Sequence, residues 1–185
     1  MPIKSHKRFA IEGLLLIEPQ VFGDSRGFFF ENYVDKAYEE IGLSTKFVQD
    51  NISKSSQGVL RGLHFQKEYP QAKLVSVIQG EVFDVAVDLR KDSPSYLQYE
   101  AVILSDKNHL QFYIPEGFAH GFYVLSDEAI FTYKVSDYYH PNDEGGIIYN
   151  DRDLKIAWPL LNDSPSLSEK DAQWPSLQEY LVQEG

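Results

Sequence analysis

The chain has 185 residues and no cysteine, and 43% of its residues are hydrophobic and 14% aromatic. This composition predicts one well-filled core and a single domain over 1–185, with an N-terminal arm at about 1–20 and a C-terminal tail at about 160–185. The 17 basic and 28 acidic residues give a net charge of −11, which argues against general nucleic-acid binding, and the lack of cysteine excludes disulfides, thiol catalysis and thiolate metal sites.

The first predicted strand covers 11–17. Basic residues followed by an apolar run superficially resemble a signal peptide, but Glu12 and Gly13 interrupt the run and Glu18-Pro19 ends it. No stretch of the sequence approaches the roughly 18 apolar residues that a membrane span needs. We therefore expect a soluble, cytoplasmic protein with no membrane partner.

Further along the chain, short apolar runs alternate with turn residues at intervals of about ten residues, which is typical of a β-sandwich or barrel. A strand at 27–33 precedes a short helix at 36–41, which Asp35 would cap and Gly42 would end. The remaining predicted strands are 46–52, 74–79, 82–89, 97–104, 110–114, 119–125, 129–136 and 147–149. A second helix is predicted in the tail, at 168–172 or 175–182. The predicted fold class is all-β with a few short helices.

The clearest hairpin joins 74–79 to 82–89 through a turn at Gly80-Glu81. Side chains alternate between the two faces of a strand, so Asp84 shares a face with Val82 and Ala86. We expect its carboxylate to face the interior.

Two histidines lie in segments that favour function. His64 belongs to GVLRGLHFQ (58–66), which brings Arg61 and two glycines close to it. His120 belongs to PEGFAHGF (115–122), whose Pro-x-Gly-x-x-His spacing resembles the second motif of the cupin superfamily. The other three histidines lie in polar or turn-like surroundings.

Cupin metal sites use two further ligands that this chain lacks. Gln66 occupies the position of the second histidine of the first motif, and Lys73 occupies the position of the glutamate. A lysine repels a divalent cation, whereas zinc and iron need neutral imidazoles and carboxylates. We therefore expect no metal, which argues against a metal-dependent cupin enzyme.

Six blocks together resemble the dTDP-4-dehydrorhamnose 3,5-epimerase family. They are FGDSRGFFFE (22–31), QDN (49–51), GVLRGLHFQ (58–66), PEGFAHGF (115–122), the run 133–144, and SEKD (168–171). The resemblance covers most of the chain, in the order of the family. It implies a cupin-type jelly-roll, a homodimer without a cofactor, and a dTDP-4-keto-6-deoxyhexose substrate inverted at C3 and C5.

The resemblance also implies catalytic roles. His64 matches the base, Asp171 the carboxylate that orients it, and Tyr133 the acid that returns a proton from the opposite face of the sugar. Lys73 is the natural cation for the enolate oxygen that develops at C4. Each residue has a structural alternative. Asp171 fits a helix capping box with Ser168, Tyr133 fits the core, Lys73 fits a solvated surface, and Asp84 is a rival partner for His64.

The substrate-binding residues implied by the resemblance fall into three groups. The first group contacts the diphosphate and nearby groups through cations or an imidazole, and consists of Arg26, Arg61, His120 and Lys170. Lys73 belongs close to the sugar. Polar contacts come from Glu31, Gln49, Asp50, Asn51 and Glu144. Tyr139 matches the aromatic residue that stacks on thymine, and Phe29 helps to line the pocket. In several relatives the binding arginine comes from the neighbouring subunit. In this chain Arg26 also fits an ordinary turn.

Two other functions remain open from the sequence. One is a 3-only or 5-only epimerase of a related nucleotide sugar, against which Tyr133 argues because single-site relatives often differ at the acid. The other is a non-catalytic module that binds sugar nucleotides. Such a module needs no acid–base pair, so the set of His64, Lys73 and Tyr133 argues against it.

Overall fold

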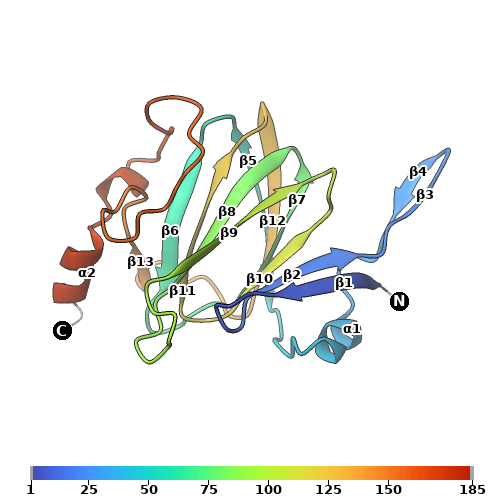
Figure 1. The fold of residues 1–185 in the computed structure, drawn as a ribbon, viewed down its shortest axis with the longest axis horizontal. Helices are drawn as coiled ribbons and strands as arrows, with labels where there is room; N and C mark the ends of the chain where they lie inside the picture. The colour runs from blue at the N-terminus through green and yellow to red at the C-terminus, as the bar shows by residue number, and fades with distance from the viewer. Residues whose placement is uncertain (1, 184–185) are drawn as a thin grey trace.

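Two antiparallel sheets form the body of the protein (Figure 1). The structure is a computed structural model that describes residues 2–183. The six-stranded sheet contains, in spatial order, β1 (Ile3–Arg8), β2 (Leu15–Pro19), β10 (Gln111–Ile114), β7 (Lys73–Gln79), β12 (Glu128–Val135) and β5 (Gln49–Ser56). The five-stranded sheet contains β13 (Glu144–Gly146), β6 (Leu60–Gln66), β11 (Phe118–Val124), β8 (Glu81–Asp88) and β9 (Tyr99–Ser105). The predicted all-β class is confirmed.

The main core lies between the two sheets because each sheet turns one row of apolar side chains inward. Val75, Phe112 and Phe131 come from the six-stranded sheet, and Val82 and Phe122 come from the five-stranded sheet. All five are buried. This row of contacts holds the sheets together and leaves room for polar side chains at one end of the space between them.

Strand β8 is buried on both faces. Val82 and Ala86 join the core between the sheets, as the alternation predicts, while Val85 and Val87 belong to a second cluster on the outer face. Residues of the C-terminal tail and of the segment just before it cover this outer face; they are Leu154, Ile156, Trp158, Leu177, Tyr180 and Leu181. The predicted tail is therefore an integral outer layer of the five-stranded sheet.

The predicted N-terminal arm is also part of the body. It forms β1 and β2, which pair with each other, and β2 pairs with β10. Strand β1 was not predicted because its sequence, IKSHKR, is polar and mostly exposed at the sheet edge. An edge strand needs only one neighbour and little burial, so its side chains carry no apolar alternation.

Other differences from the predicted elements are local. Strands β7 to β12 lie within two residues of their predicted bounds. The predicted strand 27–33 is instead a hairpin of β3 (Phe22–Asp24) and β4 (Gly27–Phe29). The predicted strand 147–149 is wrong, because the strand there is β13, which covers the three residues before it. Strand β6 was not predicted, because glycine and charged residues interrupt its apolar pattern.

The short helices follow the predictions closely. Helix α1 (Asp35–Glu40) has Val34 at its N-cap, so Asp35 is its first residue and not its cap. Gly42 ends it with a positive φ of 88°. In the tail, a 3₁₀-helix η1 (Asp171–Gln173) and helix α2 (Leu177–Gln183) occupy both predicted positions. No helix within residues 2–183 is long and apolar enough to cross a membrane.

Candidate active site

A cavity of about 340 Å³ opens between the two sheets. Nine of the predicted site residues line it, namely Gln49, Asn51, Arg61, His64, Lys73, His120, Tyr133, Tyr139 and Glu144. Four further lining residues were missed, namely Ser53, Gln71, Phe122 and Phe131. Strand alternation could have identified three of them, because Ser53, Phe122 and Phe131 each lie two residues from a predicted residue on the same strand.

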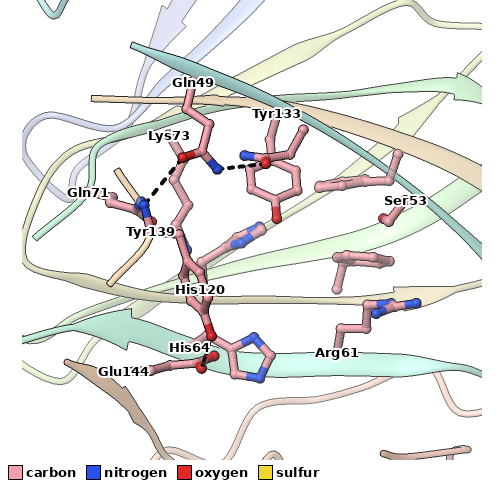
Figure 2. A pocket seen from close by; sticks show the side chains of 13 residues that line it. Gln49, Ser53, Arg61, His64, Gln71, Lys73, His120, Tyr133, Tyr139 and Glu144 are labelled. Atoms are coloured by element: carbon pink, nitrogen blue, oxygen red, sulfur yellow. Dashed lines mark hydrogen bonds between the residues drawn. The ribbon is translucent and has the colours of Figure 1, made fainter. Parts of the chain in front are cut away.

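The two sheets supply opposite walls of this cavity. His64 and His120 come from β6 and β11 of the five-stranded sheet, whereas Lys73 and Tyr133 come from β7 and β12 of the six-stranded sheet. Figure 2 shows His64 and Tyr133 entering the cavity from opposite sides. A flat molecule bound between them would meet one residue on each face.

The two histidines are neighbours because β6 and β11 approach very closely. His64 and His120 are partners in the antiparallel register. Gly62 has a φ of +133°, and a Cβ built on it would lie 2.5 Å from the Cα of Gly121. Only glycine fits at this contact. Gly62 thus sets the position of His64.

His64 is hydrogen-bonded to Asp171, which lies 107 residues further along the chain. The other carboxylate oxygen of Asp171 accepts a hydrogen bond of 2.8 Å from the Ser168 hydroxyl, and the Asp171 amide donates one of 3.0 Å to that hydroxyl oxygen. Burial works to raise the pKa of Asp171, but the hydrogen bonds from His64 and Ser168 outweigh it, so the pKa is lowered. Asp171 therefore contacts His64 and also pairs with Ser168, but a full capping box does not form, because Lys170 is the N-cap of η1 and the carboxylate accepts from the Ser168 hydroxyl.

His120 has its own carboxylate partner. Its Nε2 lies 2.9 Å from Oδ2 of Asp84, and both side chains are buried. Burial lowers the pKa of His120, although Asp84 opposes this. Asp84 faces inward as predicted, but it contacts His120, and the carboxylate at His64 is Asp171.

Lys73 is buried at the start of β7, so the solvated-surface interpretation is wrong. Burial lowers the pKa of its ammonium to about 8, with Asp84 and Glu144 acting in the opposite direction. A lysine with this pKa is mostly protonated at neutral pH. It places one positive charge in a site of low dielectric, where the charge acts strongly on a developing anion.

Tyr133 belongs both to the core and to the cavity. Its ring lies 6.0 Å from the ring of Phe131, between centroids, while its hydroxyl points into the cavity (Figure 2). Burial raises the pKa of this hydroxyl, with Arg61 acting against the shift and Glu144 adding to it. The group therefore stays protonated and is available as a proton donor.

A polar network surrounds the mouth of the cavity. Oε2 of Glu144 accepts hydrogen bonds from the Tyr139 hydroxyl at 2.9 Å and from Nζ of Lys170 at 2.7 Å. The Gln49 side chain accepts a hydrogen bond from the Tyr139 amide at 3.3 Å and donates one to Asn51 at 2.8 Å. Nε of Arg61 donates to the Ser55 hydroxyl at 3.0 Å. The predicted polar residues thus form one connected surface with an aromatic ring in it.

Six predicted residues do not line this cavity. Asp171 and Lys170 contact lining residues from behind, His64 and Glu144 respectively, and the other four lie elsewhere. Asp50 points to the other face of β5, where Lys134 donates a hydrogen bond of 2.6 Å to it. Alternation requires this, because Gln49 and Asn51 on either side of it face inward. Arg26 and Phe29 lie on the β3–β4 hairpin, which projects away from the body (Figure 1), and Glu31 follows it in an exposed segment.

The residues at the cupin metal positions do not fit a metal. The Gln66 side-chain amide donates a hydrogen bond of 2.6 Å to the Tyr69 carbonyl, and its oxygen accepts one of 2.8 Å from the His140 backbone amide. Lys73 brings a positive charge to the position that a glutamate ligand occupies in cupin metal sites. Within residues 2–183 no three His, Asp or Glu side chains are grouped in a way that could hold a metal ion.

Comparison with known proteins finds close relatives over almost the whole chain. The family model described as dTDP-4-dehydrorhamnose 3,5-epimerase matches residues 8–179. Proteins of that name from Methanothermobacter thermautotrophicus and Salmonella typhimurium are 53% and 54% identical to this chain, over 94% and 95% of it and 94% and 96% of their own lengths. A crystal structure of dTDP-6-deoxy-D-glucose-3,5-epimerase from Legionella pneumophila, in complex with dTDP-4-keto-L-rhamnose, superimposes with a TM-score of 0.91 at 54% identity, covering 94% of this chain and 93% of that one.

Proposed function

The chain belongs to the dTDP-4-dehydrorhamnose 3,5-epimerase family, and from this premise we propose how its cavity performs the reaction. The enzyme is an isomerase that inverts C3 and C5 of dTDP-4-dehydro-6-deoxy-D-glucose to give dTDP-4-dehydro-L-rhamnose. One observation carries the proposed mechanism: His64 and Tyr133 line one cavity from opposite sheets. Inversion at carbon needs this arrangement, because the proton leaves from one face and returns to the other.

His64 is the base that removes the proton at C3 and then the proton at C5. Its hydrogen bond to Asp171 fixes the tautomer, so the other ring nitrogen carries the lone pair that accepts the proton. The Asp171 carboxylate then stabilises the imidazolium that forms. After each inversion the imidazolium returns its proton to solvent, which restores the base.

Lys73 stabilises the enolate. Removal of a proton beside the C4 ketone moves the electron pair of the C–H bond into a new C=C bond and leaves negative charge on the C4 oxygen. A buried ammonium next to this oxygen lowers the barrier because it is already oriented when the charge develops. The same oxygen serves both C3 and C5, so one lysine supports both half-reactions.

Tyr133 donates a proton to the carbon from the face opposite His64. The enolate collapses to the ketone as the C–H bond forms, and the resulting phenolate is reprotonated from solvent. The high pKa of the hydroxyl keeps it protonated before this step. A phenol is a suitable donor because the enolate carbon is strongly basic.

The mouth of the cavity binds the nucleotide. Arg61 and Lys170 suit the diphosphate, since guanidinium and ammonium groups pair well with phosphate oxygens. His120 offers a neutral imidazole as a polar contact. The Tyr139 ring offers a stacking surface for thymine. The amides of Gln49 and Asn51 and the carboxylate of Glu144 supply polar contacts.

A homodimer completes the site. The hairpin that carries Arg26 and Phe29 points away from the cavity of its own chain, and its aromatic residues Phe22, Phe28 and Phe29 are each more than half exposed. We propose that the hairpin delivers Arg26, Phe29 and Glu31 to the cavity of a second subunit.

The proposal also places the enzyme in the cytoplasm, where nucleoside triphosphates for nucleotide-sugar synthesis are available.

The test is NMR of dTDP-4-keto-6-deoxyglucose incubated with the enzyme in D₂O. We expect deuterium at both C3 and C5, with inversion at both carbons. In Tyr133→Phe, His64 still exchanges the proton but no acid acts on the opposite face, so deuterium enters with retention. Deuterium at one carbon only in the wild type would contradict the two-carbon mechanism. No exchange with dTDP still bound would indicate a binding module instead.

A further inference from the structure

Trp174 lies at the junction of the C-terminal tail and the cavity, directly after η1. Its indole Nε1–H donates a hydrogen bond of 3.3 Å to Oδ1 of Asp171. The same oxygen atom accepts the hydrogen bond from His64. Trp174 therefore contacts the carboxylate at the atom that governs the imidazole.

The ring of Trp174 also packs directly on His64. The two rings meet edge to face, with centroids 5.9 Å apart and an interplanar angle of 66°. Gly146, the partner of His64 in the antiparallel register of β13 and β6, makes room for the indole. A Cβ built on Gly146 would lie 2.3 Å from Cδ2 of the indole. A larger residue at 146 would displace the indole from the imidazole.

These contacts restrain both members of the pair. Four donors surround the Asp171 carboxylate, namely the Ser168 hydroxyl, the His64 ring, the Trp174 indole and the Gly62 backbone amide. A carboxylate with this many partners cannot rotate without losing a hydrogen bond. The indole also holds one side of the imidazole, so the direction of its free nitrogen is fixed before substrate binds.

We propose that Trp174 is a positioning residue for the epimerisation, holding Asp171 and His64 in the orientation in which His64 removes the substrate protons. This rests on the proposed role of His64 as the base. Trp174 itself is absent from the lining of the cavity. It acts through the two residues that it contacts, so its effect is on turnover and not on nucleotide binding.

The ionisation of His64 depends on several elements packed around it. Asp171 from η1 contacts it directly, and Glu144 from β13 and His120 from β11 interact with it electrostatically. Other charged or titratable groups of the same site are Arg61, Lys73, Tyr133, Tyr139 and Lys170. Trp174→Phe leaves all of these groups in place. It removes the indole donor and puts a smaller ring at the position over which Nζ of Lys170 lies, 6.0 Å from the ring centroid.

The chain offers a matched control in its second tryptophan. Trp158 is also half-buried in the tail, donates its indole N–H to a carbonyl (Tyr149, 2.8 Å) and meets an aromatic ring edge to face (Phe83, 5.8 Å, 68°). It makes none of the contacts to His64 or Asp171 described for Trp174. Trp158→Phe therefore reproduces the loss of a tryptophan hydrogen bond without touching the base.

We expect Trp174→Phe to lower kcat about tenfold with KM for the nucleotide sugar nearly unchanged, because a hydrogen bond to a charged group has been lost in the catalytic pair only. Without this donor the carboxylate attracts the imidazolium more strongly. The acidic limb of the kcat/KM profile should therefore move to higher pH. Trp158→Phe should change neither quantity, although both variants lose similar thermal stability.

Equal kcat and pH profiles in the two tryptophan variants would overturn the proposal. His64→Ala separates this failure from failure of the proposed base. If His64→Ala retains turnover, His64 is not the base. If it loses turnover while Trp174→Phe behaves like Trp158→Phe, only the role of Trp174 is wrong.

A spectroscopic readout gives independent evidence. The chain has two tryptophans, so in Trp158→Phe the only remaining indole is Trp174. An imidazolium quenches indole fluorescence more strongly than a neutral imidazole does, so this fluorescence should titrate with the midpoint of the acidic limb of kcat/KM. The titration should be absent from the double variant Trp158→Phe/His64→Ala. Its persistence there would contradict the contact between Trp174 and His64.

Discussion

Two histidine–aspartate pairs lie side by side in the five-stranded sheet, and they differ in the origin of the carboxylate. Asp84 of the second pair comes from β8, which is hydrogen-bonded to β11, the strand of His120. Asp171 of the first pair comes from η1 in the tail, 107 residues after His64. One pair is thus built within the sheet and the other joins the sheet to its outer layer.

Exposure separates the two pairs further. The His64 side chain is 27% exposed, whereas that of His120 is 8% exposed and has a pKa lowered by burial. Lys73 also disfavours protonation of His120. The same two functional groups therefore make an accessible base in one place and a buried neutral imidazole in the other. A carboxylate partner alone therefore does not make a histidine a base.

The largest expected effect distinguishes the two imidazoles. We expect His64→Ala to lower kcat by a factor of about 10²–10⁴, the usual contribution of a general base, while dTDP still binds. His120→Ala should cost only about tenfold, because it removes one polar contact. Turnover by a coupled reductase assay and dTDP binding by calorimetry measure both. Equal losses of kcat would remove the distinction between the pairs.

The two carboxylates come next. Asp171→Asn should lower kcat about a hundredfold, since an amide cannot stabilise the imidazolium of His64 or hold its tautomer. Asp84→Asn should keep more of the wild-type kcat at pH 7 than Asp171→Asn keeps. It should reduce thermal stability instead, because it weakens a fully buried pair. The reverse ranking of the two kcat values would assign the orienting role to Asp84.

Gly62 tests the close approach of β6 and β11, on which both pairs depend. Gly62→Ala should reduce the free energy of unfolding by about 2–4 kcal/mol, since the new methyl meets the backbone of β11 and the φ is strained. Gly27→Ala is the matched control, because Gly27 has nearly the same φ, +132°, but no atom within 4 Å of a Cβ built there. Urea unfolding of both variants measures the difference. Equal losses would mean that backbone conformation, and not the contact, requires glycine.

The smallest effect concerns the basic limb of the pH profile. The wild-type kcat/KM should fall as pH rises through about 8, the pKa of Lys73, because the enolate loses its cation. Asp84 raises this pKa, so Asp84→Asn should move the basic limb to lower pH by about one unit. Asp171→Asn should leave the basic limb in place. A limb that moves equally in both variants would show that Lys73 does not set it.

Local patterns explain which elements were predictable. The turn at Gly80, the strands from β7 to β12 and the end of α1 at Gly42 each depend on a few neighbouring residues, so they could be predicted well. Strand β1 could not, because pairing along the edge of the sheet imposes no apolar pattern on it. Asp50 shows a signal that was present but not used, since alternation with Gln49 and Asn51 already excluded it from the cavity.

The fold class, the family resemblance and the residue types of the site follow from the amino-acid sequence, because motifs and side-chain periods are properties of adjacent positions. Which groups meet depends on tertiary packing. It joined His64 to Asp171, joined Asp84 to His120, buried Lys73 and set Trp174 against the base. Partner choice and burial arise from how strands and tail pack across long sequence separations, and no local pattern carries that information.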